Sequence, residues 1–176
     1  MHVQETCSAG GPVVVLPAEL ASSWGGVDSG DYGRACYPRD HRLIDHGAVG
    51  WVSMGQARAI VLDLELMTAY LPTQGGGVIL RNYAKDELTT EAARTMLGAV
   101  DAVDGWAAWG EPLPLVDGRL FMFDAACPGA SDPAGIDAEE GVIVASPGAG
   151  RYAIHVAVVD GVELIRLQRL VSLSGA

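Results

Sequence analysis

The stretch RLFMFDAACPGASDP, residues 119–133, opens the part of the chain that decides its fold. Its residues 120–124 read as an apolar strand that ends on a carboxylate, and a turn-rich loop follows. Three further strand signals come later, at 142–144, 152–158 and 162–167. Asp160 and Gly161 separate the last two, and Asp-Gly between alternating apolar runs is a strong hairpin signal. The last third of the chain is therefore predicted to form a small antiparallel meander.

Two more hairpins are predicted upstream. Residues 48–54 and 57–62 flank Gly55-Gln56, and residues 68–72 and 78–81 flank a run of three glycines. In both pairs β-branched and aromatic residues alternate with small or polar ones, as in strands. Residues 13–16 read Val-Val-Val-Leu, and a short run that is wholly apolar indicates a central strand.

One long helix is predicted over 86–103. Leu88, Ala92, Met96 and Val103 recur there at intervals of four or seven residues, and Asp86 can serve as the N-cap. A short helix is predicted over 17–24, whereas residues 27–47 look irregular and polar and are the first candidate surface.

The order of strands, one long helix and further strands predicts an α+β fold, with a mainly antiparallel sheet and the helix packed on one face. The alternation then places a set of apolar residues in one core under that helix. This set comprises Phe121, Phe123, Ile154, Val156 and Leu164.

Length and composition limit the possible classes of protein. The 176 residues suit one domain, spanning 1–176 and ordered from about 10 to 171, and 49% apolar against 19% charged residues indicates a globular chain. No apolar run is long enough to span a membrane, and the first residues lack the pattern of a secretory signal. Three cysteines form no disulfide framework, so the expected location is the cytoplasm.

The charge is strongly acidic and unevenly distributed. The net charge is −11, and residues 82–140 hold 12 acidic and 3 basic side chains, a net charge of −9. This charge disfavours nucleic acid as a direct ligand, because phosphate binding needs a basic face. A basic protein partner is compatible with this charge.

Few residues suggest catalysis or metal binding. Asp40-His41 and Asp45-His46 place carboxylates beside imidazoles, but their spacing of five residues matches neither a helical face nor one face of a strand. No further ligands complete a tetrahedral set, so we expect no metal and no cofactor. Cys36 lacks an evident activating base, and Asp124 is expected to brace the turn at Pro128.

Several motifs in order carry a family resemblance. They are GGPVVVLP at 10–17, DYGRAC at 31–36, AYLP at 69–72, RNYA at 81–84, FMFDAACPG at 121–129 and PGAGRYAI at 147–154. Together they resemble the Immunity protein 21 family of bacterial polymorphic toxin systems, from about residue 10 to 170. The resemblance implies a small cytoplasmic α+β protein that neutralises a cognate toxin, and it brings no catalytic residues.

Three functions are open from the sequence, and the least specific of them is a structural subunit of an assembly. The first is binding of a basic toxin through an acidic face, without catalysis. The residues assigned to that face are Asp31, Tyr32, Arg34, Asp132, Asp137, Glu139 and Glu140. The second is binding or reshaping of a small apolar ligand, as in a cofactor-free cyclase or isomerase. Its pocket would be lined by Trp51, Tyr70, Trp106 and Trp109, with Asp124 or His155 as the polar group.

Overall fold

A computed structural model describes residues 3–44, 47–63, 66–81, 89–100, 102–137 and 141–170, with the side chains of 39–44, 47 and 48 left out. Its strands form two antiparallel sheets. The seven-stranded sheet has the order β1 (Gln4–Thr6), β6 (Thr68–Thr73), β7 (Gly76–Arg81), β13 (Val162–Arg169), β12 (Gly150–Val159) and β8 (Ala107–Ala108), and β9 (Leu113–Leu115) also pairs with β12. The six-stranded sheet has the order β11 (Ile143–Ala145), β10 (Leu120–Asp124), β2 (Val13–Pro17), β5 (Ala57–Leu62), β4 (Gly47–Met54) and β3 (Arg39–Ile44).

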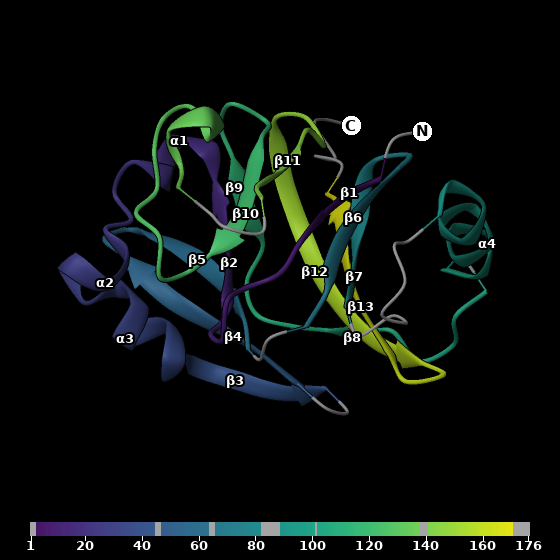
Figure 1. Ribbon diagram of the computed structural model, residues 1–176. Helices are drawn as coiled ribbons and strands as arrows, with labels where there is room; N and C mark the ends of the chain where they lie inside the picture. The colour runs from purple at the N-terminus through teal and green to yellow at the C-terminus, as the bar shows by residue number, and fades with distance from the viewer. Residues whose placement is uncertain are drawn as a thin grey trace.

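The helices are short and cover the outer faces of these sheets. They are α1 (Ala18–Ala21), α2 (Gly26–Ser29), α3 (Asp31–Cys36), α4 (Thr90–Val100) and the 3-10 helix η1 (Pro133–Gly135). Figure 1 shows α1, α2 and α3 on the left, beside the six-stranded sheet, and α4 on the right, beside the seven-stranded sheet. The fold is therefore mainly antiparallel β with few helices, more β-rich than the α+β fold predicted with one long helix.

Three apolar clusters follow from this arrangement. The core between the sheets holds Val15, Ile60 and Met122 from one sheet and Ile79, Ile154 and Ile165 from the other. A second cluster, with Val14, Leu16 and Phe121, lies on the outer face of the six-stranded sheet under α1 and α3. A third, with Leu71, Leu80 and Leu164, lies on the outer face of the seven-stranded sheet under α4. Both sheets are thus covered on both faces.

The hairpin predictions are confirmed. β4 and β5 pair around Gly55-Gln56, β6 and β7 pair around Gln74-Gly75, and β12 and β13 pair around Asp160-Gly161. The apolar strand β2 is central in its sheet, with every residue buried.

The predicted C-terminal meander is wrong. β10 pairs with β11 in one sheet and β12 pairs with β13 in the other, so the chain changes sheets after Ala145. The predicted single core is wrong for the same reason. Phe121 and Phe123 lie in the second cluster, Ile154 and Val156 in the core between the sheets, and Leu164 under α4. Alternation separates the two faces of a strand correctly, but it does not say what covers each face.

Two local predictions also need correction. The stretch 27–47 is not irregular, because it holds α2, α3 and β3, and its helices are too short to show a helical period. The long helix is shorter than predicted, since α4 ends at Val100 and the two residues after Asp101 continue as a turn. Asp86, the expected N-cap, lies outside the described residues.

Candidate functional site

Short helices and a loop form one layer over the six-stranded sheet, which we call the helix–loop layer (residues 18–37 and 125–137). Trp24 is buried in it, and its Nε1 donates a hydrogen bond to the carbonyl of Ala125 at 2.9 Å. Val27 N donates to Ala126 O at 3.1 Å, and Gly129 N donates to Trp24 O at 2.7 Å. These backbone bonds join the helices to a loop about a hundred residues away in sequence, so the layer is held as one surface.

Asp31 orders this layer from within. Its side chain is buried, accepts a hydrogen bond from Gly25 N at 2.7 Å, and forms an ion pair with Arg34. Burial alone would raise the pKa of Asp31, but hydrogen bonds from Gly25, Ser29 and Arg34 outweigh it and hold the pKa below its usual value. Asp31 therefore stays ionised and fixes α3, and contributes little exposed charge.

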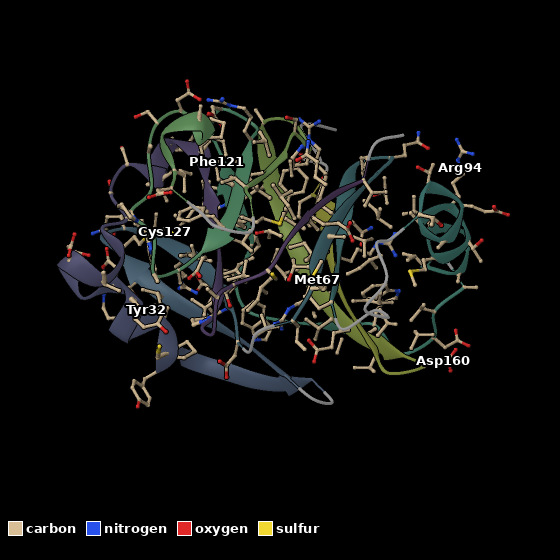
Figure 2. The ribbon with its side chains drawn as sticks, viewed as in Figure 1. Tyr32, Met67, Arg94, Phe121, Cys127 and Asp160 are labelled. Atoms are coloured by element: carbon tan, nitrogen blue, oxygen red, sulfur yellow. The ribbon has the colours of Figure 1, made fainter. Side chains whose placement is uncertain are left out.

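Tyr32 is half-buried and packs against the second apolar cluster. Its hydroxyl lies against Gly11, where an added Cβ would come within 2.6 Å of the oxygen. Burial raises the pKa of Tyr32, and the nearby Cys36 thiol and Asp124 carboxylate raise it further. Figure 2 shows Tyr32 and Cys127 on this side of the molecule, far from Arg94 and Asp160.

Arg34 and its neighbours line a hollow at the edge of the layer. The hollow has a volume of about 250 Å³ and is lined by Arg34, Tyr37, Trp51, Val52 and Ser53. Arg34 donates from Nη1 to the carbonyl of Ser53 at 2.9 Å, which joins α3 to β4. Tyr37, at the C-terminal end of α3, is 86% exposed. Tyr37 and Ser53 were not predicted from the sequence as site residues. The one feature that could have indicated Tyr37 is that it is an aromatic residue in a polar stretch.

Exposed carboxylates also lie on the helix–loop layer. Asp132 and Asp137 are exposed at either side of η1, and Asp132 caps η1 by accepting from Ala134 N at 3.0 Å. Asp28 on α2 is exposed as well and was missed from the sequence. Glu139 and Glu140 lie outside the described residues.

The described acidic residues of the segment 82–140 do not gather on one surface. Glu91 lies on α4, on the far side of the seven-stranded sheet from Asp132. Glu111 pairs with Arg58 at 2.9 Å, and Asp117 pairs with Arg119 at 2.8 Å. The linear charge count therefore overstates how much negative charge gathers at one place.

Of the aromatic residues assigned to a ligand pocket, three lie in the core between the sheets and Trp106 lies apart from them. Trp51 and Trp109 stack with ring centroids 4.5 Å apart and an interplanar angle of 8°, and both belong to the core between the sheets. Tyr70 is in that core too, where its hydroxyl donates to Gly76 O at 3.1 Å. Trp106 packs instead against the cluster under α4. Trp51, Trp109 and Tyr70 therefore pack in the core between the sheets.

The polar groups assigned to that pocket lie in different sheets. Asp124 ends β10, and its carboxylate accepts from Ala126 N at 2.8 Å and from Ala9 N at 3.0 Å, so it braces the turn as expected. His155 lies on β12, opposite Arg166 on β13. Its Nδ1 is buried without a hydrogen-bond partner.

In the described part of the chain, no group of three or more His, Cys, Asp or Glu side chains could hold a metal ion. The side chains of Asp40-His41 and the residues Asp45-His46 fall outside the described set. Among the described residues, no helix is long and apolar enough to cross a bilayer.

The protein is thus a two-sheet antiparallel β protein. Its helix–loop layer carries exposed carboxylates and has a hollow at its edge. The chain matches the family model of Immunity protein 21 over residues 5–163, and it belongs to that family. The resemblance read from the sequence motifs is thereby confirmed. No curated protein and no solved structure matches the chain.

Proposed function

We propose that this protein binds and neutralises a cognate bacterial toxin in the cytoplasm, and that it acts by binding and not by catalysis. Membership of the Immunity protein 21 family over residues 5–163 carries this proposal. The toxin would be blocked by a protein surface that covers its active region.

The binding face in this proposal is the helix–loop layer. Asp28, Asp132 and Asp137 are exposed there, and the chain as a whole carries a net charge of −11. Such a field favours a basic toxin, because complementary charge raises the association rate and rejects acidic partners. The backbone bonds that join α2 to the loop at Ala126 hold this face in place before the toxin arrives.

The test uses the toxic domain encoded by the neighbouring gene, with protection of cells on co-expression and stopped-flow association as readouts. The screening length falls from about 10 Å at 0.1 M salt to about 3 Å at 1 M, so association should slow markedly between these salts while dissociation changes less. The triple variant Asp28→Asn, Asp132→Asn, Asp137→Asn should slow association at low salt in the same way.

The matched control is the triple variant Glu91→Gln, Asp104→Asn, Asp160→Asn. It removes the same number of exposed carboxylates from α4, from the turn after it and from the β12–β13 hairpin. Both triple variants lose three negative charges. After correction for this change in net charge, the association rate of the control should stay within about twofold of the wild-type rate. Equal slowing by both triples would show that net charge acts and not this face. Failure of the wild-type protein to bind or protect would overturn the proposed function itself.

A further inference from the structure

We infer that the hollow between α3 and β4 receives one side chain of the partner protein, a side chain with an apolar body and a hydrogen-bond acceptor at its tip. We call this hollow the α3 socket, lined by Arg34, Tyr37, Trp51, Val52 and Ser53. This inference rests on the proposed function and names the part of the surface where the partner docks.

The size of the socket argues for a side chain. Its volume of about 250 Å³ lies below the range of about 300–1,000 Å³ that is usual for sites of drug-sized ligands. A single large side chain inserted from a protein surface fills a space of this size, as hot-spot residues do in well-packed interface pockets.

The chemistry of the walls defines the occupant. Tyr37 is the wall that offers exposed aromatic surface to an apolar body, because Trp51 and Val52 are each only 4% exposed. At the rim, the Arg34 guanidinium donates to Ser53 O and to the Asp31 carboxylate, and these bonds use two of its five N–H groups. The remaining donors suit a carbonyl, hydroxyl or carboxylate oxygen. Because Asp31 offsets the charge of Arg34, the socket does not repel a partner that is basic elsewhere.

The exposed residues at the rim are of the types that dominate interface energetics. Tyrosine and arginine are enriched at hot spots, and Tyr37 is the most exposed of the large hydrophobic residues in the described structure, at 86%. Arg34 is held on two sides, by Ser53 and by buried Asp31, so little side-chain entropy is lost when a partner binds.

Gly33 provides an independent observation. It lies within the α3 helix, is exposed, and has nothing within 4 Å of the place where a Cβ would be. Its φ is not in the left-handed region, so neither packing nor backbone geometry in the folded chain requires glycine. A helical glycine lowers stability relative to alanine, so its presence is explained if another backbone approaches α3 there.

The experiment measures the dissociation constant with the domain encoded by the neighbouring gene as the probe. Tyr37→Ala should weaken binding by about 30-fold, which is the usual size of a hot-spot loss. Val116→Ala is the control, because Val116 is 77% exposed and lies outside the layer, and its binding should match wild type.

Gly33→Gln separates docking from folding. Glutamine is a good helix former, so this variant should raise the melting temperature by about 2–4 °C while binding weakens by about tenfold or more. If wild type binds and both Tyr37→Ala and Gly33→Gln bind equally well, the socket inference is overturned and the proposed function stands. If wild type itself does not bind, both are overturned.

Discussion

Arg81 and Glu163 form an ion pair inside the protein, with 3.0 Å between Nη1 and Oε2 and both side chains fully buried. They lie directly opposite each other on β7 and β13. Arg81 also donates to the carbonyl of Asp63, which follows β5 in the other sheet. Burial lowers the pKa of Arg81 to about 10, although the charges of Glu163 and Asp63 oppose this shift. The pair therefore lies within the seven-stranded sheet, and Arg81 links that sheet to the segment that follows β5.

Removing one charge of this pair should destabilise the protein strongly. Glu163→Gln takes the carboxylate away from a guanidinium that stays buried, and breaking a buried pair from one side costs about 3–5 kcal/mol. Urea unfolding measures the loss. Glu111→Gln breaks the exposed Arg58–Glu111 pair and should change stability by less than about 1 kcal/mol. Similar small losses for both variants would show that the buried pair adds little.

The buried phenol of Tyr70 should make the stability of the protein fall at alkaline pH. Burial, and to a lesser extent Tyr152, raises the pKa of the Tyr70 phenol far above its usual value of 10.0. A raised folded pKa gives stability that is present below pH 10 and is lost as the pH rises above it, because the unfolded chain releases the proton first. The loss is about 1.4 kcal/mol for each pH unit above 10.

Comparison with Tyr70→Phe isolates this effect. At pH 8 the variant should be less stable by about 1 kcal/mol, since it lacks the hydrogen bond to Gly76. Between pH 10 and 11.5 the wild-type protein should lose stability faster, so the difference shrinks and then reverses. Urea midpoints at several pH values measure it, and parallel pH profiles for the two proteins would rule this role of Tyr70 out.

Local sequence signals predicted local structure well. The three hairpins were recognisable because the residues of a two-residue turn carry its geometry, as at Asp160 and Gly161 with φ of 50° and 79°. The division into two sheets was not recognisable. Alternation in β10 separates Phe121 from Met122, but the covering of Phe121 comes from helices about a hundred residues earlier in the chain.

For the candidate surface too, local sequence predicted only part of the structure. Asp132 and Asp137 could be named from composition and prove to be exposed. Asp31 was named as well, yet it is buried because Gly25 and Arg34 satisfy its carboxylate. The socket depends on β4 passing beside α3, a contact that no local pattern encodes. Long-range contacts decide which polar residues face solvent, so spacing along the chain could not assign them.

The β12–β13 turn should depend on Gly161. Its φ of 79° lies in the left-handed region, where a Cβ costs about 1–2 kcal/mol. Gly161→Ala should lose about that much stability in urea unfolding, whereas Asp160→Gly, at a φ of 50°, should lose almost none. A Gly161→Ala variant as stable as wild type would mean that the turn adopts another geometry in solution.

Extensive chelation should leave the melting temperature unchanged. The sequence offers no complete ligand set, and metal-dependent folds lose stability when the metal is removed. Thermal unfolding before and after treatment with a chelator measures this. A fall of several degrees that zinc reverses would point to the His41 and His46 region.

Gly129 should be essential for the helix–loop layer. An added Cβ would lie 2.0 Å from the carbonyl oxygen of Ala21, the last residue of α1, and Gly129 also donates its N–H to Trp24 O. Gly129→Ala therefore forces α1 and the loop apart, and overpacking of this kind costs about 1–3 kcal/mol. Gly98→Ala is the matched control, because Gly98 lies in α4 with nothing within 4 Å of its Cβ position, so alanine should stabilise by about 1 kcal/mol. Urea unfolding of both variants should give shifts of opposite sign, and two stabilising shifts would show that the loop does not pack on α1.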